Sequence, residues 1–314
     1  MLILDSIQTA SGLPFDRLID ALDRMFVSGC SVPLRHSHSI ECGPDEAPGT
    51  LLLMPAWQKG GRIGIKTVSV FPANRNKSLP GLHSTFVLLD ATTGVPLSML
   101  DGDVITSRRT AAASALAARF LSRPDSANLL LLGSGRVGSL IPDAYAAVRP
   151  IKKVAVWDVD AHGARSLVDT LNARGFSAEV AEDLEHAVGS TDIVSCATLS
   201  TRPLVKGAWL RPGTHLDLIG GFTPTMRESD DDCFVGTSVF VDTEEALMKA
   251  GDLLSPIESG AFDKAATRAA LAQLCRGEHP GRQDRDEITV FKAVGTALED
   301  LAAASLAYDA AAGA

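Results

Sequence analysis

The spacing of hydrophobic positions divides the chain into two parts that meet near residue 126. In the first part, residues 14–28 carry apolar side chains at helical spacing, which predicts an amphipathic helix. After a predicted loop over residues 41–49, four apolar runs with short connections predict an antiparallel or mixed sheet: 49–55, 62–72, 84–90 and 96–100. The alanine-rich segment 110–121 predicts a further helix, with Ser107 or Thr110 available as its cap.

The second part alternates short apolar runs with helical or loop segments, which predicts a doubly wound parallel sheet that ends near residue 285. Six runs are the predicted strands: 128–132, 154–157, 178–180, 193–196, 215–219 and 239–242. The final segment, 288–312, is predicted to be a long helix that is entered through residues 289–291.

The first strand of the second part leads into a glycine-rich turn that is typical of dinucleotide-binding βαβ units. The turn reads Gly133-Ser-Gly135-Arg-Val-Gly138, and the next apolar run ends at Asp158. The first glycine permits the tight turn, the second lets the backbone approach a pyrophosphate, and the third lets the helix pack on the strand. Free N–H groups at the start of this helix attract phosphates. Pro142 predicts that the helix starts late or is kinked.

Asp158 bears on the choice of cofactor, because it directly ends the second strand of this unit. A carboxylate at this place accepts a hydrogen bond from a free ribose 2′-hydroxyl and repels a 2′-phosphate. The sequence therefore predicts NAD(H), with NADP less favoured.

Composition mainly excludes other classes of protein. The 314 residues suffice for two domains, and a net charge of −9 without a Lys/Arg run argues against a nucleic-acid partner. Five cysteines that form no CxxC pair are typical of a reducing compartment. The sequence contains neither a signal peptide nor a long apolar stretch, so we expect a cytoplasmic protein without a membrane partner. Hydrolase and NTPase functions have no support, since GxSxG and GxxxxGK[ST] motifs are missing.

Several stretches, in order along nearly the whole chain, resemble the ornithine cyclodeaminase and mu-crystallin family, which includes some alanine dehydrogenases and ketimine reductases. The matching stretches are 49–56, 66–72, 88–94, 101–115, the glycine turn, 197–198, 212–213, 241–242 and 289–295. The resemblance implies an α/β protein in which a Rossmann-type, doubly wound NAD-binding domain (121–287) is inserted in an α+β substrate-binding and dimerisation domain (1–120 plus 288–314). It also implies a homodimer. The cofactor-binding residues expected from the motif and the resemblance are Thr110, Gly133, Ser134, Gly135, Arg136, Val137, Gly138, Asp158, Ala197 and Thr198.

Three basic residues lie in or near the matching stretches. The resemblance implies that Arg35, Lys66 and Arg109 bind the carboxylate of a small substrate beside the nicotinamide ring. The chemistry supports such a role, because a guanidinium binds a carboxylate through two parallel hydrogen bonds. Lys66 lies within an apolar run, where an ammonium usually faces an anion, and it is the expected proton donor; the alternative is a strand lysine that points to solvent. Lys66 and Arg109 are thus the expected catalytic residues.

Phe222 is the main departure from the family pattern. The resemblance places it where cyclodeaminases and related alanine dehydrogenases have an aspartate, which would hold the distal amine of ornithine. Phenylalanine has no ionisable group that could hold this amine. If Phe222 faces the substrate, an apolar wall would suit an aliphatic, aromatic or cyclic-imine side chain.

Other side-chain groups carry weaker indications. His36 and His38 with Glu41 and Cys42 match no closed zinc pattern, and the acidic run 230–232 is more typical of a solvated helix start, so we expect no metal. His83 is a candidate acid or base, with a surface role as the alternative.

Three functions compete at this point. The leading hypothesis is an NAD(H)-dependent enzyme that moves a hydride to or from the α-carbon of a small amino, imino or oxo acid. Ornithine cyclodeaminase, which converts ornithine to proline and ammonia, is the alternative within the family, and Phe222 argues against it. A non-catalytic, nucleotide-dependent protein that binds a small ligand is the alternative from another class.

Overall fold

The computed structural model describes residues 1–43 and 46–313, which form two compact units. The first unit consists of Met1–Arg109 and Thr296–Ala314, and the second of Thr110–Gly295. The chain therefore leaves the first unit once and returns to it for its last segment. The predicted loop 41–49 includes residues 44 and 45, which lie outside the described part of the chain.

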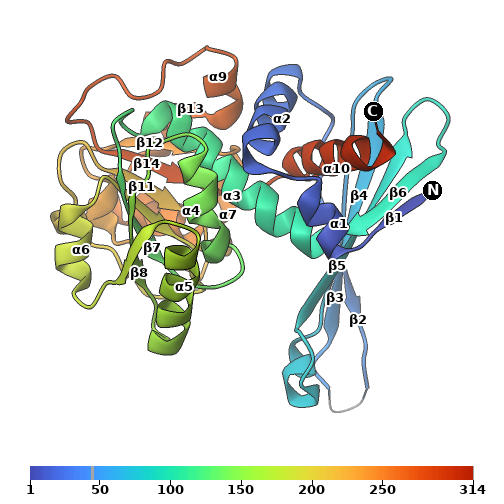
Figure 1. The fold of residues 1–314 in the computed structure, drawn as a ribbon, viewed down its shortest axis with the longest axis horizontal. Coiled ribbons are helices and arrows are strands. Elements are labelled where there is room, and N and C mark those ends of the chain that lie inside the picture. Colours follow the sequence, from blue (N-terminus) through green and yellow to red (C-terminus); the bar gives the residue numbers. More distant parts are fainter. Residues whose placement is uncertain (44–45, 314) are drawn as a thin grey trace. The chain divides into compact units, whose positions relative to one another are not determined.

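The first unit contains a six-stranded sheet in the order β1-β6-β5-β4-β3-β2 (Figure 1). Its strands are β1 (Leu2–Leu4), β2 (His36–Ile40), β3 (Gly49–Trp57), β4 (Arg62–Val70), β5 (Leu82–Asp90) and β6 (Pro96–Asp101). The pairing of β1 with β6 is parallel and the other four pairings are antiparallel, so the sheet is mixed. The four strand-like runs predicted from the sequence correspond to β3, β4, β5 and β6.

Helices cover one face of this sheet. They are α1 (Ser6–Ser11), α2 (Phe15–Ser28) and α10 (Ala297–Ala312). The apolar stripe predicted for residues 14–28 is buried in α2, which packs against α10, and α10 in turn packs against β3 and β4. The last helix of the chain thus completes the core of the unit that the first residues begin.

Helix α3 (Gly102–Leu121) starts in the first unit and ends in the second. The prediction that it begins at 110 with Ser107 or Thr110 as its cap is wrong. The Asp101 carboxylate instead accepts a 2.8 Å hydrogen bond from the Val104 N–H, which caps the helix eight residues earlier. Gly102, a poor helix former, concealed this start. A Cβ at this position would lie 2.7 Å from the backbone of Ser84, so glycine is needed for the close contact with β5.

The second unit contains an eight-stranded sheet in the order β13-β12-β14-β11-β10-β7-β8-β9, in which every pairing is parallel. Its strands are β7 (Asn128–Leu132), β8 (Lys153–Trp157), β9 (Ser177–Val180), β10 (Ile193–Cys196), β11 (His215–Leu218), β12 (Ser238–Val241), β13 (Ala269–Ala270) and β14 (Thr289–Lys292). The order reverses between β7 and β10, because β8 and β9 extend to one side and β10 and β11 to the other. This is the Rossmann-type, doubly wound arrangement.

Strand β14 corrects the prediction for the end of the chain. Residues 289–291 were expected to lead into a long helix, but β14 pairs with β11 and β12 inside the second sheet. The run Thr-Val-Phe is rich in β-branched and aromatic residues and is buried, which favours a strand. Helix α10 begins only at Ala297, so the boundary expected at 288 differs from the one observed at Gly295.

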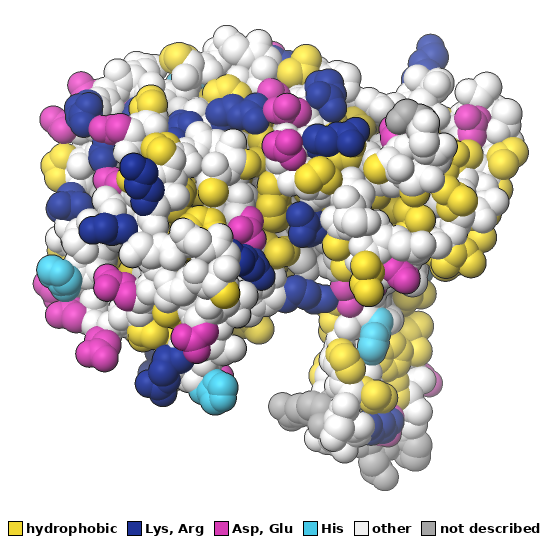
Figure 2. Space-filling view, in the orientation of Figure 1, with side chains coloured by type: hydrophobic (Ala, Val, Ile, Leu, Met, Phe, Trp, Pro, Cys, Tyr) yellow, Lys and Arg dark blue, Asp and Glu magenta, His cyan; other side chains and the backbone are white. Residues whose placement is uncertain are grey.

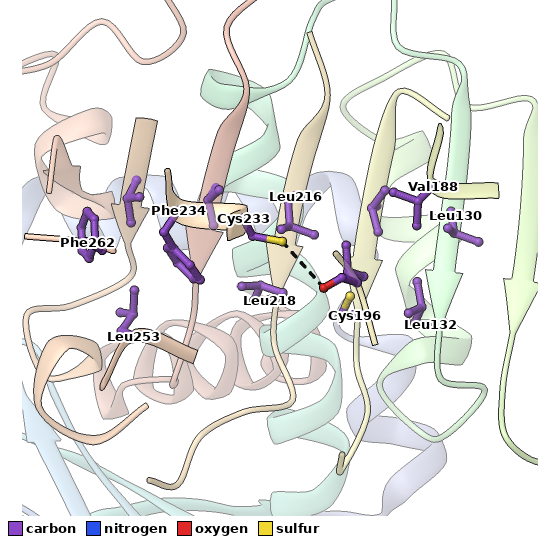
Figure 3. Close-up of a cluster of buried hydrophobic side chains, with 14 of the residues drawn as sticks. Leu130, Leu132, Val188, Cys196, Leu216, Leu218, Cys233, Phe234, Leu253 and Phe262 are labelled. Atoms are coloured by element: carbon purple, nitrogen blue, oxygen red, sulfur yellow. Dashed lines mark hydrogen bonds between the residues drawn. The ribbon is translucent and has the colours of Figure 1, made fainter. Parts of the chain in front are cut away.

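Six helices accompany the parallel sheet: α4 (Ile141–Ala146), α5 (Ala161–Ala173), α6 (Leu184–Ser190), α7 (Ala246–Lys249), α8 (Gly251–Ser259) and α9 (Leu271–Cys275). A 3-10 turn over Gly138–Leu140 precedes α4, and Pro142 lies in the first turn of α4. The late helix start expected from this proline is confirmed. Figure 3 shows the core on one face of the sheet, a cluster that includes Leu130, Leu216 and Leu218 of the strands together with Phe234 and Leu253. Among the described residues, no helix is both long and apolar enough to cross a membrane.

Candidate functional site

Two buried cations of the first unit share one carboxylate. The ammonium of Lys66, on β4, lies 2.6 Å from Oδ2 of Asp300, and Nε of Arg109, on α3, donates a 2.9 Å hydrogen bond to Oδ1 of the same residue. The side chains of Lys66 and Arg109 come from different segments, β4 and α3, and the structure brings them together. Asp300 is the group that joins them.

A second acid and a hydroxyl complete this cluster. Glu299 accepts a 2.6 Å hydrogen bond from Nη1 of Arg109, and Nζ of Lys66 lies 3.3 Å from Oγ1 of Thr106. Lys66 and Arg109 are 2% and 6% exposed, and both acids are fully buried. Two positive and two negative charges thus balance within a region that water scarcely reaches. We call Lys66, Arg109, Glu299 and Asp300 the charge cluster.

The ionisation of the cluster follows from burial and pairing. Burial lowers the pKa of Lys66, although Asp300 opposes this effect. Burial also disfavours the charged form of Arg109, but Asp300 and Glu299 outweigh it and raise the pKa of Arg109. Burial raises the pKa of Asp300, but Lys66 and Arg109 outweigh it, so the pKa of Asp300 lies below its usual value. Of the two cations, Lys66 therefore releases a proton more readily.

The local sequence explains why these side chains point inward. In β4, alternate residues face the helices of the unit, so Gly64, Lys66 and Val68 are buried together. Glu299 and Asp300 lie in the first turn of α10, where the helix dipole favours negative charge.

The other two expected substrate-binding residues lie elsewhere. Arg35 is exposed just before the edge strand β2, and β3 separates that strand from β4, which carries Lys66. Phe222 belongs to the second unit, follows the carboxyl end of β11 and is 50% exposed. An exposed aromatic ring at this end of a parallel sheet is consistent with a role in ligand binding, but it is not held in place by core packing.

The glycine turn of the second unit has the geometry that a dinucleotide needs. Gly133 has φ +99°, a conformation that residues with a side chain rarely adopt. A Cβ at Gly138 would overlap the carbonyl oxygen of Gly133, so the turn closes tightly only with glycine there. A Cβ at Gly135 would meet nothing within 4 Å, so this backbone is open to a ligand. The turn also includes Ser134, Arg136 and Val137.

Asp158 lies beside this turn at the end of β8. Its Oδ2 accepts hydrogen bonds from N (2.6 Å) and Oγ (2.7 Å) of Ser134, and its Oδ1 accepts one from the N–H of Asp160 (2.9 Å). Burial raises the pKa of Asp158, but these hydrogen bonds outweigh it, so the pKa lies below its usual value and the carboxylate is charged. The residues present therefore fit the adenosine half of NAD(H).

Two further expected cofactor residues adjoin the same edge of the sheet. Ala197 and Thr198 follow β10, and a Cβ on Gly133 would lie 2.6 Å from the Ala197 carbonyl oxygen. Thr110, the remaining expected cofactor residue, is the first residue of the second unit, within α3.

The sequence did not identify Glu299 and Asp300 as site residues. The only signal was a pair of acids in the apolar run Ala297-Leu-Glu-Asp-Leu-Ala, where a charged residue calls for a buried partner. A second set of buried charges, Glu228, Asp252 and Lys292, was also missed.

The remaining polar groups have structural or surface positions. His36 and His38 are exposed on β2, and His83 is exposed on β5. Asp231, at the start of a 3-10 turn over Asp231–Phe234, pairs with Arg227 at 2.7 Å. Within residues 1–43 and 46–313, no three His, Cys, Asp or Glu side chains are grouped to hold a metal ion.

Comparison with known proteins gives consistent matches. The ornithine cyclodeaminase/mu-crystallin family matches residues 6–314. The Δ1-pyrroline-2-carboxylate reductase of Paracoccus denitrificans (strain Pd 1222) is 40% identical over 281 residues, which cover 88% of each chain. The structure of Thermococcus litoralis Δ1-pyrroline-2-carboxylate reductase with NADH and L-proline is similar with a TM-score of 0.91 at 32% identity, covering 100% of this chain and 98% of that one. An archaeal alanine dehydrogenase dimer with bound NAD has a TM-score of 0.90 at 29% identity, with coverage of 100% and 96%.

Proposed function

Because the chain belongs to the ornithine cyclodeaminase/mu-crystallin family, we propose that this NAD(H)-dependent oxidoreductase reduces a cyclic imine carboxylate of the Δ1-pyrroline-2-carboxylate type to the cyclic amino acid. The observation that carries the proposal is the charge cluster, in which Asp300 holds two buried cations side by side. Relatives with reductase activity on this imine, and one structure with L-proline bound, support the choice of substrate.

In the proposed reaction the residues of the chain have separate roles. Arg109 binds the substrate carboxylate, since a guanidinium matches its two oxygens, and the ammonium of Lys66 assists. When bound, NADH supplies a hydride to the carbon of the C=N bond. Once the iminium carbon has received the hydride, Lys66 gives a proton to the nitrogen of the new amine, and its lowered pKa favours that release. Lys66 then regains a proton from solvent, so the reaction consumes one NADH and one proton for each imine.

The balance of charge in the cluster favours a particular substrate form. Because Lys66 and Arg109 are already matched by Glu299 and Asp300, a bare carboxylate would add an uncompensated negative charge to a buried region. A protonated imine with a carboxylate is neutral overall and avoids that cost. We therefore expect iminium carboxylates to be reduced better than oxo acids of the same size.

A panel of substrates tests the proposal. The purified protein is assayed for NADH oxidation with Δ1-pyrroline-2-carboxylate, its six-membered analogue, pyruvate with and without ammonia, and a buffer blank. We expect the cyclic imines to give the highest kcat/KM. Turnover with pyruvate and ammonia alone would replace the proposal with an alanine dehydrogenase. Proline and ammonia formed from ornithine with catalytic NAD would replace it with a cyclodeaminase.

We also propose that the protein is a homodimer formed through the sheet of the first unit. The sheet face opposite the helices bears Pro55, Ile65, Val87 and Met99 in register across β3, β4, β5 and β6, and none of them is fully buried. Figure 2 shows hydrophobic side chains gathered over this sheet. An exposed apolar face of this kind is typical of a protein interface. Sedimentation should give a dimer, and Ile65→Glu should give a monomer; a monomeric wild type would exclude the interface.

A cytoplasmic location fits this proposal, because the exposed Cys42 and the buried Cys196 are both free thiols, as is usual in reducing compartments. Cell fractionation would test it, and recovery of the protein from an oxidising compartment would overturn it.

A further inference from the structure

Glu228 links two turns at the carboxyl edge of the parallel sheet. Its Oε1 accepts hydrogen bonds from N (2.7 Å) and Oγ1 (2.9 Å) of Thr198, which follows β10. Its Oε2 accepts hydrogen bonds from the N–H groups of Gly220 (2.6 Å) and Gly221 (3.3 Å), which follow β11. Each oxygen of a fully buried carboxylate thus serves a different turn.

These turns are packed in a row with the glycine turn after β7. A Cβ on Gly220 would overlap the carbonyl oxygen of Thr198, and a Cβ on Gly133 would lie 3.2 Å from Cγ2 of Thr198. Neither neighbour leaves room for Thr198 to move toward it. The position of the turn after β10 is therefore set by the glycine turn on one side and by Gly220 with Glu228 on the other.

Glu228 is itself held by charged groups on other elements. Oδ1 of Asp252, on α8, accepts a 2.7 Å hydrogen bond from the Glu228 N–H, and Oδ2 of Asp252 pairs with Nζ of Lys292, on β14, at 3.0 Å. The buried thiol of Cys196, on β10, is a further titratable group nearby. Burial raises the pKa of Glu228 to about 7, an effect that Lys292 opposes and Asp252 reinforces. Two buried carboxyl groups share one buried cation, Lys292, an arrangement that is costly to maintain for stability alone.

The position of the turns after β10 and β11 in the sheet indicates which ligand Glu228 helps to bind. In doubly wound sheets the ligand lies outside the carboxyl ends of the strands, where the strand order reverses, and here that point is between β7 and β10. The glycine turn and Asp158 lie at β7 and β8 and fit the adenosine half of NAD(H). The turns after β10 and β11 lie on the other side of the reversal, where the nicotinamide half of a dinucleotide extends.

We propose that Glu228 is a positioning residue that holds the turns after β10 and β11 in place for the nicotinamide half of NAD(H). It acts through Thr198, Gly220 and Gly221 and does not contact the reacting atoms. The inference rests on dinucleotide binding but not on the identity of the imine, so it can fail or succeed independently of the proposed substrate.

Binding measurements without substrate test this role. Calorimetric titrations at pH 8 compare NADH with ADP-ribose, which lacks the nicotinamide, for the wild type and Glu228→Gln. The Gln variant keeps the shape but turns an NH2 group toward N–H donors, so NADH affinity should fall about tenfold or more, since hydrogen bonds to a charged group are lost. ADP-ribose affinity should change less than about twofold, because its binding residues are untouched.

Controls separate this role from a loss of folding. Glu185→Gln makes the same chemical change at an exposed position on α6 and should leave both affinities unaltered. Glu228→Asp keeps the negative charge but has a side chain shorter by one methylene group. Its affinity for NADH should fall by less than that of Glu228→Gln, again with little change in the affinity for ADP-ribose. Near-UV circular dichroism identifies the folded variants. Equal losses for NADH and ADP-ribose, or unchanged NADH affinity in a folded variant, would overturn the proposal.

Discussion

The carboxylate of Asp300 lies 2.6 Å from the ammonium of Lys66, although the two residues are 234 positions apart in the sequence. Both are buried, so each supplies the charge that makes the burial of the other tolerable. The position of Lys66 is therefore set in part by helix α10, which carries Asp300, and this relationship can be tested directly.

Replacing Asp300 should destabilise the protein. Asp300→Asn leaves Lys66 and Arg109 with Glu299 as their only acidic partner in the cluster, and the loss of one partner from a buried ion pair costs about 3–5 kcal/mol. Urea unfolding measures the change. Asp309→Asn, on the same helix, removes a partly exposed pair with Arg62 and should cost less than about 1 kcal/mol. If the two variants lost similar amounts of unfolding free energy, the burial of the charge cluster would not be the cause of the destabilisation.

Replacing Lys66 should impair the chemical step. Lys66→Met removes the proposed proton donor, so kcat with the cyclic imine should fall about 10²–10⁴-fold, the usual contribution of a general acid. NADH affinity should not change, because Lys66 lies outside the second unit. Steady-state kinetics and calorimetry provide the two measurements, and Lys59→Met, an exposed lysine of the first unit, is the control. Full activity of Lys66→Met would remove Lys66 from the mechanism.

Replacing Asp158 should relax the preference for NADH. Asp158→Ser removes the carboxylate that repels a 2′-phosphate, so the ratio of kcat/KM for NADPH to that for NADH should rise about 10–100-fold, equivalent to about 1.4–2.8 kcal/mol. Asp169→Ser, an exposed acid on α5, should leave the ratio unaltered. An unchanged ratio in Asp158→Ser would mean that another residue discriminates between the cofactors.

A buried acid should make stability depend on pH. Asp217 accepts hydrogen bonds from Tyr145 (2.8 Å), Ser195 (2.7 Å) and Ser114 (3.0 Å), and burial raises its pKa from 3.8 to about 6. Between pH 4 and pH 6 the folded state holds a proton that the unfolded state has lost, so this group costs stability as pH rises.

In Asp217→Asn the side chain has no titratable proton, so the variant should not lose stability in this way as pH rises. Its free energy of unfolding, relative to that of the wild type, should increase by about 2.4 kcal/mol between pH 4 and pH 7, because each pKa unit corresponds to about 1.4 kcal/mol. Urea unfolding of both proteins across this range gives the difference. A difference independent of pH would show that Asp217 has an ordinary pKa.

The features that the sequence revealed are those encoded within short segments. The turn from Gly133 to Gly138 joins two adjacent strands, so its glycines and the acid at Asp158 can be identified from local spacing alone. The antiparallel strands of the first unit likewise follow from runs with short connections. Lys66 and Arg109 were named from the family resemblance, and the structure brings them together.

The features that the sequence concealed depend on partners that are distant in the chain. A strand as short as Thr289–Lys292 resembles the entrance to the helix that follows, and only its place between β11 and β12 distinguishes it. Asp300 has no motif around it, because its partners come from β4 and α3. Glu228 resembles any loop acid until the turns that it joins are folded.

The return of the chain to the first unit also fixes an order of events during synthesis. The second unit is one continuous segment and can fold as soon as residue 295 has left the ribosome. The first unit cannot, because α10 emerges after the second unit and must cover a sheet whose strand β3 begins 248 residues earlier, at Gly49 against Ala297 for α10. Until then Lys66 and Arg109 lack Asp300 and remain hydrated. The nascent chain therefore buries the charge cluster only after α10 has been made, and a chain without α10 would leave Lys66 and Arg109 without their buried acidic partners.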